Sequence, residues 1–175
     1  MSVPTHTTPP PPIPQEVRDW VPATRTLLVG GSMVQPRGET WDVFNPATEA
    51  VIATVSGASA DQVDAAVLAA RTAFPAWAAL SGAERGAYIH RFADALEAAA
   101  DRLLPSIVNE VGTPVSLAEY LQVKMAVQEH LRWAADAAAT DRTVHLGRYE
   151  TPWPTMSDVV HEPVGVVAAI TGYNY

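Results

Sequence analysis

The sequence contains no cysteine among its 175 residues. This absence excludes disulfides, thiolate metal sites and a thiol nucleophile, and it is typical of proteins in a reducing compartment. Long apolar runs are also missing, since no stretch approaches the ~20 residues of a membrane span. The polar, proline-rich amino end lacks the basic and apolar regions of a signal peptide. We therefore expect a cytoplasmic protein with no membrane partner.

Basic residues are scarce, with 11 Lys and Arg against 19 Asp and Glu and a net charge of −8. A nucleic-acid surface needs clustered Lys and Arg, and no such cluster occurs, so we expect no nucleic-acid partner. The five histidines show no paired ligand spacing, and we predict no metal site. Apolar residues make up 48% of the chain, enough for one ordinary domain with a core.

Proline is concentrated at the amino end, where residues 1–22 hold Pro4 and a run from Pro9 to Pro14. Such a tract favours an extended, polyproline-like conformation over helix or sheet. It could be a docking ligand for an aromatic-lined groove, but a flexible surface arm is the favoured interpretation.

The segment 23–142 begins with strand patterns and continues with helical ones. A short strand from about Arg25 is predicted to end at Gly30-Gly31. Alternating residues over 41–57 predict a hairpin or a meander that turns at Asn45–Thr48. Four helices follow by apolar periodicity and capping patterns. Their predicted bounds are Ser59 to Pro75, Ser81 to about Ala100, Asp101 to Gly112, and an N-cap at Thr113 with Pro114 as the first helical residue, running to 139.

The stretch 143–171 reads as strand, turn and strand, with Pro152 and Pro154 at an edge or loop. The run "VGVVAAIT", residues 164–171, is almost wholly apolar and predicts a strand buried on both faces of a parallel sheet. Ligands of such sheets bind beyond the carboxyl ends of the strands. A crossover helix should follow in a βαβ unit, and none is present, so we expect the fold to be incomplete in this chain.

Three stretches together resemble the amino-terminal third of an aldehyde dehydrogenase. They are "NPATEAVIATV", "AARTAFPAWAALSGAERGAYIHRFADALEAAADRLLPSIVNEVGTP" and "HEPVGVVAAITGYNY", and the resemblance covers roughly residues 25–175. The family usually has Pro-Trp-Asn-Phe where this chain has Gly172, Tyr173, Asn174 and Tyr175. The Asn stands in register, while the Pro-to-Gly and Trp-to-Tyr changes depart from the pattern.

The resemblance implies a fold class: an α/β chain forming the amino-terminal part of a Rossmann-type cofactor domain, with helices and an oligomerisation hairpin. Residues 23–142 would begin that domain, residues 143–160 would pair with other copies, and residues 161–175 would return into the domain. NAD or NADP is the implied cofactor, and a small-molecule aldehyde is the implied substrate.

The resemblance also implies roles for single residues. Asn174 matches the family Asn whose side-chain amide helps to form the oxyanion hole, and it is the implied catalytic residue. Ile170, Thr171, Gly172 and Tyr173 match the segment that lines the NAD(P) cleft beside the nicotinamide ribose. The alternative is that Ile170 and Thr171 are plain strand residues and that Tyr173 only packs.

The family's remaining machinery lies downstream of the closing motif. Its cysteine nucleophile, general-base Glu, ribose-binding Lys/Glu pair and Gly-rich turn are absent from this sequence. The first hypothesis is therefore the amino-terminal segment of an NAD(P)-dependent aldehyde dehydrogenase, inactive by itself. The alternative is a non-catalytic interaction module that pairs with a full-length partner. We expect the isolated chain to oligomerise or to be partly molten.

Overall fold

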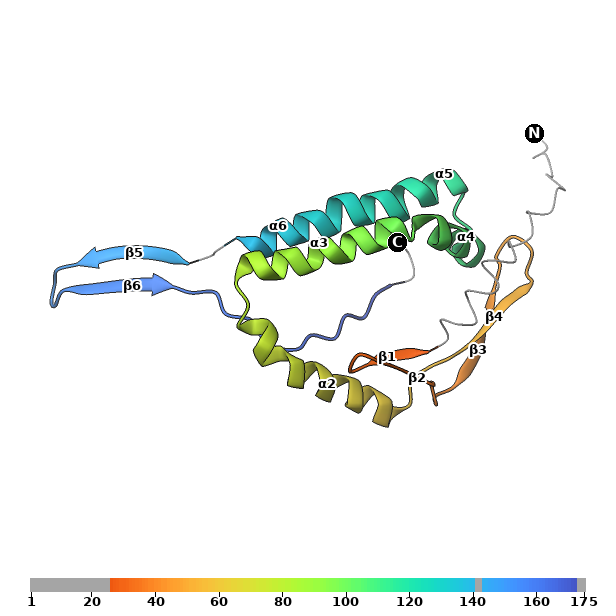
Figure 1. Cartoon of the computed structure of the whole chain (residues 1–175), viewed down its shortest axis with the longest axis horizontal. Coiled ribbons are helices and arrows are strands. Elements are labelled where there is room, and N and C mark those ends of the chain that lie inside the picture. The colour runs from red at the N-terminus through yellow and green to blue at the C-terminus, as the bar shows by residue number, and fades with distance from the viewer. Residues whose placement is uncertain (1–25, 141–142, 173–175) are drawn as a thin grey trace, which may run out of the picture.

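The computed structural model describes residues 26–140 and 143–172. These residues form three two-stranded antiparallel sheets and a set of helices. Figure 1 shows a long helical pair on one side, α2 with two small hairpins on the other, and a third hairpin projecting from one end. The arrangement is mixed α and β, as the sequence predicts, but the described residues contain no parallel strand pair.

The first two hairpins confirm the predicted strand before Gly30-Gly31 and the two predicted strands around Asn45–Thr48, but the sequence did not predict a strand directly after Gly31. β1 (Leu27–Val29) and β2 (Ser32–Val34) are joined at Gly30-Gly31, where both residues have a positive φ that glycine accepts without strain. β3 (Thr40–Phe44) pairs with β4 (Val51–Ser56). In their turn, Asn45 Oδ1 accepts hydrogen bonds from the N–H groups of Ala47 at 2.9 Å and Thr48 at 3.2 Å.

Asn45 also fixes this hairpin to α4 (Ala100–Val111). Its side chain is buried, and its Nδ2 donates to Asn109 Oδ1 at 2.9 Å. Asn109 Nδ2 donates in turn to the Pro105 carbonyl at 2.7 Å. Gly112 ends α4 at φ 77°, where an added Cβ would lie 2.6 Å from Pro46 Cγ. The turn and the helix end therefore fit each other only with glycine at this position.

The first long helix, α2, spans Ala60–Ala78 and runs through Pro75. The predicted end at Pro75 is therefore wrong. A proline loses its own N–H donation and crowds the carbonyl four residues before it, but the residues after it can stay helical, and the Pro75 carbonyl accepts from Ala79 N–H at 3.1 Å. The predicted start at Ser59 is confirmed, because Gln62 Oε1 accepts from the Ser59 backbone N–H at 3.1 Å.

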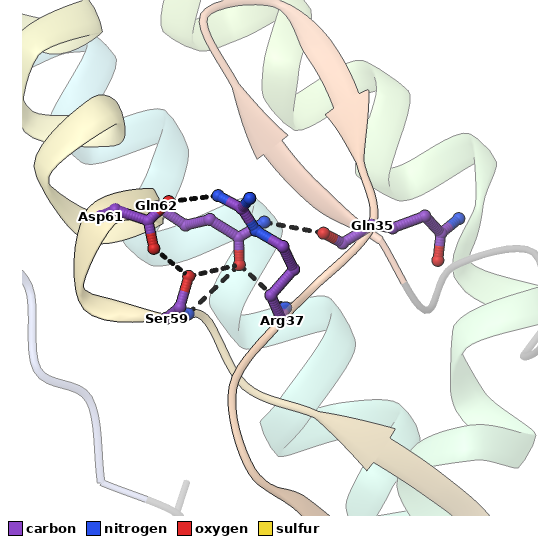
Figure 2. A network of polar contacts seen from close by, with 5 residues as sticks. All are labelled: Gln35, Arg37, Ser59, Asp61 and Gln62. Carbon is purple, nitrogen blue, oxygen red and sulfur yellow. Dashed lines mark hydrogen bonds and ion pairs between the residues drawn. The ribbon is translucent and has the colours of Figure 1, made fainter.

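A polar cluster ties the start of α2 to the chain after β2 (Figure 2). Gln62 is buried, its Nε2 donates to the Gln35 carbonyl at 2.7 Å, and its Oε1 accepts from Arg37 N–H at 2.9 Å. The Arg37 guanidinium pairs with Asp61, which also accepts from the Ser59 hydroxyl at 2.6 Å. One buried amide thus satisfies backbone groups of two separate segments.

The remaining helices follow the predicted order. α3 spans Gly82–Ala98, with Ser81 as its N-cap as predicted. The last helix is continuous, and it comprises α5 (Val115–Leu117), a segment of π-type turns (η1, Ala118–Leu131) and α6 (Arg132–Ala139). The predicted N-cap at Thr113 is wrong by one residue. Pro114 has an extended ψ of 140° and takes this role, since its carbonyl accepts from Leu117 and Ala118 N–H.

α3 packs against α6 through a seam of very small residues. An added Cβ at Gly86 would lie 2.8 Å from the Ala135 carbonyl oxygen, and one at Gly82 would lie 2.8 Å from that of Ala138. Ala93 and Ala135 are fully buried. Beside this seam, Arg132 pairs across the helices with Asp94 at 3.0 Å and with Glu97 at 2.7 Å. The axes of α3 and α6 can therefore approach closely, and the ion pairs of Arg132 fix the register of the two helices.

The third hairpin pairs β5 (Val144–Tyr149) with β6 (Thr155–Val159), and it lies where the resemblance implies a hairpin, within residues 143–160. It projects from the helices in Figure 1, and every residue of both strands is exposed. His145 Nδ1 lies 2.7 Å from Asp158 Oδ1 across the pair.

The predicted buried strand 164–171 is wrong for the described structure. This stretch is extended but belongs to no sheet, and Val164 and Ile170 are 94% and 96% exposed. Residues 162–172 make no backbone hydrogen bond to any other described residue. The composition suits a buried strand, but no described strand lies beside it to complete a ladder.

The seam predicts that Gly86→Val destabilises the chain by about 1–3 kcal/mol, because the new side chain would meet the α6 backbone. Ala87→Val on the same helix is the matched control, since Ala87 is exposed and loses only helix propensity, about 0.5 kcal/mol. Urea unfolding followed by circular dichroism measures both. Equal losses in the two variants would contradict the close approach of the helices.

Candidate functional site

The sequence-predicted site lies at the end of the segment that follows β6. In Figure 1 this segment returns from the projecting hairpin and runs between α2 and the α3–η1 pair. Ile170, Thr171 and Gly172 are all exposed at its end. Tyr173 and Asn174 lie outside the described residues.

The described residues do not enclose this segment. An added Cβ at Gly172 would meet no atom within 4 Å, and the Ile170 side chain is almost fully exposed. A dinucleotide site normally buries most of its ligand between opposing walls. The described end of this segment is open to such a ligand. By themselves, the described residues form no pocket that would enclose a dinucleotide.

The segment starts at a well-defined place in the helical framework. A groove of about 740 Å³ separates its first residues from the facing ends of α3 and α6. Its polar lining includes Ser81, Arg85, His161 and Glu162. The Arg85 guanidinium donates to the Leu80 carbonyl, which closes the turn between α2 and α3. The facing helix ends therefore border the start of the segment, and no pattern in the sequence predicted this groove.

The carboxylates of Asp61 and Glu84, in the first turns of α2 and α3, form hydrogen bonds that cap these helices. The Glu84 carboxylate accepts from the Ser81 backbone N–H at 2.7 Å and from its hydroxyl at 2.8 Å, and these bonds hold the pKa of Glu84 below its usual range. The pKa of Asp61 is lowered mainly by the Ser59 hydroxyl and further by Arg37. Both carboxylates are exposed and ionised, with their hydrogen bonds directed at capping groups.

The cluster around Gln62 is the other concentration of polar groups, and it borders a cavity of about 400 Å³. Its members hydrogen-bond to one another, as Figure 2 shows, so none is left directed at a ligand. Sequence reasoning found Ser59 and Gln62 through the capping pattern but missed Arg37, because its partner Asp61 lies 24 residues away. We assign this cluster to the fold.

Two further kinds of site were sought in the described ranges. Within residues 26–140 and 143–172, no group of three or more His, Asp or Glu side chains is arranged to hold a metal ion. No helix in the same ranges is long and apolar enough to cross a membrane.

Comparisons with known proteins agree with the resemblance. A sequence model of the aldehyde dehydrogenase family matches residues 33–175. The geranial dehydrogenase of Castellaniella defragrans is 32% identical over 152 residues, which cover 85% of this chain and 31% of that protein. The chain thus spans about a third of the length of this curated relative.

Solved structures give the same relationship. An NAD-dependent benzaldehyde dehydrogenase from Corynebacterium glutamicum is 29% identical with a TM-score of 0.65, over 73% of this chain and 28% of that one. A mutant of aldehyde dehydrogenase C from Pseudomonas syringae, in complex with NAD+ and octanal, is 36% identical with a TM-score of 0.65, over 70% of this chain and 25% of that one.

The two capping pairs predict separate pKa changes. Ser59→Ala should raise the pKa of Asp61 toward its ordinary value, and Ser81→Ala should raise that of Glu84 only in part, because the backbone N–H bond to Glu84 remains. Both folded-state pKa values are depressed, so their contribution to stability is present above the unfolded pKa and is lost as pH falls through the folded pKa.

Side-chain carboxyl NMR titration of the two variants measures these shifts, and each variant is the control for the other. A change in Glu84 caused by Ser59→Ala, or unchanged pKa values in both variants, would contradict the assigned hydrogen bonds.

Proposed function

The chain belongs to the aldehyde dehydrogenase family, whose members oxidise aldehydes with NAD or NADP, and we propose that it contributes the Ile170–Asn174 wall of such an active site. The reaction converts an aldehyde to a carboxylic acid through a cysteine thiohemiacetal. When bound, the nicotinamide cofactor accepts the hydride that leaves the aldehyde carbon. What supports the proposal is the family match over residues 33–175, which includes the closing motif.

Asn174 is the proposed catalytic residue. When a thiolate attacks the aldehyde, the carbonyl oxygen becomes an alkoxide, and an amide N–H held at that position stabilises the new charge. Ile170, Thr171, Gly172 and Tyr173 precede it and are proposed to line the cofactor cleft. The exposed, extended run up to Gly172 supports this, because its last residues are open to a ligand.

The nucleophile must come from residues other than these. Positions 1–175 contain no cysteine, and no other side chain forms the thiohemiacetal and thioester of this reaction. We therefore propose that the 175-residue chain alone does not oxidise aldehydes and acts only where another part of the fold supplies the thiol.

A second proposed role is an interaction module that pairs with other copies or with a full-length family member through residues 143–160. The observation that favours it is the projecting hairpin, whose exposed apolar side chains include Val144, Leu146 and Met156. An open two-stranded edge of this kind accepts further strands.

A chimera tests the role of Asn174. In it, residues 33–175 of this chain replace the matching segment of the geranial dehydrogenase of C. defragrans. Asn174→Ala should lower the kcat of geranial oxidation by about 100- to 1000-fold, because the alkoxide loses one preorganised donor. Formation of the reduced nicotinamide, followed by absorbance, gives the rate.

Tyr175→Phe in the same chimera is the control and should keep the parent rate, which also shows that the chimera folds. The isolated 175-residue chain should give no aldehyde-dependent signal. A chimera that keeps its rate after Asn174→Ala, or an isolated chain that turns over, would refute the assignment.

A further inference from the structure

An exposed aromatic surface lies near the corner that joins α2 to α3 in Figure 1. The ring centroids of Trp77 and Tyr88 are 5.7 Å apart in an edge-to-face contact, and the Arg91 guanidinium lies over the Tyr88 ring, 4.2 Å from its centroid. Phe92 stands one turn further along α3, on the face that carries Tyr88. All three aromatic side chains are exposed. We call these four side chains the aromatic surface.

This surface has the chemistry that a proline-rich peptide fits. Such peptides dock onto exposed aromatic rings, and they lose little entropy because the polyproline conformation forms before binding. Arg91 has no ion pair with another described residue, so a carboxylate of the ligand can pair with it. The surface therefore suits a run of prolines with an acidic residue close by.

The amino end of the same chain contains a ligand of this kind. Residues 9–14 read Pro-Pro-Pro-Pro-Ile-Pro, and Glu16 and Asp19 follow them. These residues lie outside the described ranges. Because proline has no backbone N–H to donate, neither a helix nor a sheet competes for this run.

The chain between the prolines and the described residues is long enough for the contact. Gly30 lies against α2, because an added Cβ there would be 3.5 Å from Ala69 Cβ. Trp77 lies about 12 Å further along the helix axis, and β1 adds roughly 13 Å back to Thr26. Residues 15–25 span about 36 Å when extended, which exceeds the sum of these two distances. The proline run can therefore reach the aromatic surface of its own chain.

A tethered ligand needs only weak affinity to stay bound. A linker of this length holds the prolines at an effective concentration of about 1 mM. A contact with a Kd of about 0.1 mM is then about 90% formed within one chain. The amino end of a second copy reaches the same occupancy only at millimolar protein concentration, so the chain's own prolines are the favoured occupant.

We propose that residues 9–14 dock onto the aromatic surface of their own chain, with Glu16 beside Arg91. The sequence alone favoured a surface arm without a fixed contact. The exposed rings of Trp77 and Tyr88, held against each other within reach of the prolines, are the observation that favours docking. The docked prolines cover apolar rings that otherwise contact water. This inference does not depend on the proposed function.

A spin label tests the docking, because the sequence has no cysteine and Thr8→Cys gives a single attachment point. In the full 175-residue chain, a nitroxide at this position should broaden the indole N–H signal of Trp77 in the NMR spectrum. Tyr88→Ala should weaken the docking about tenfold, since it removes an aromatic anchor. The docked fraction should then fall from about 90% to about 50%, and the Trp77 signal should sharpen.

Tyr120→Ala is the matched control, because Tyr120 is a similarly exposed tyrosine on η1 outside the aromatic surface, and it should leave the broadening unchanged. Pro11→Gly together with Pro12→Gly should also sharpen the Trp77 signal, since glycine lacks the polyproline preference. This double variant changes no described residue, so it tests the docking even if circular dichroism shows that Tyr88→Ala unfolds the chain.

The proposal is overturned if the label does not broaden Trp77, or if the broadening in the double glycine variant equals that in Tyr120→Ala. It is also overturned if the prolines of one copy bind another copy. A mixture of labelled chain with unlabelled, isotope-enriched chain detects that case, because the label would then broaden Trp77 of the enriched copy.

Discussion

The backbones of α3 and α6 approach each other until the position of Gly86 has room for nothing larger than hydrogen beside the Ala135 carbonyl. This contact, together with the Arg132 ion pairs, fixes the two helices as a unit. The projecting hairpin follows the end of α6, and the segment that returns from it passes the same helix ends at His161–Pro163. The point at which this segment starts, at His161–Pro163, therefore depends on this seam.

The remaining apolar surface is only partly used. The buried apolar side chains of the described residues are Ala and Val, and large ones on α2, α3 and the hairpins stay exposed. The apolar extended segment 164–171 has no described strand beside it, and the apolar helix surfaces have no full cover. Added strands would cover both.

Interactions between residues close together in the sequence were predictable, whereas those between distant residues were not. The capping residues Ser59 and Ser81 and the turn at Asn45 were found because each acts on groups only a few residues away. The hydrogen bond from Asn45 to Asn109 joins residues 64 positions apart, and no sequence pattern indicated it. The strand over 164–171 was predicted from its composition, but pairing needs a neighbour that composition does not supply.

Hydrogen exchange of the isolated chain, resolved by residue, tests the central claim most directly. The account predicts exchange at intrinsic rates for the amides of residues 164–172 and slow exchange for the α3 and α6 amides beside Gly86 and Ala135. Slow exchange across 164–172 in the isolated chain would contradict it, because those amides would then already have partners.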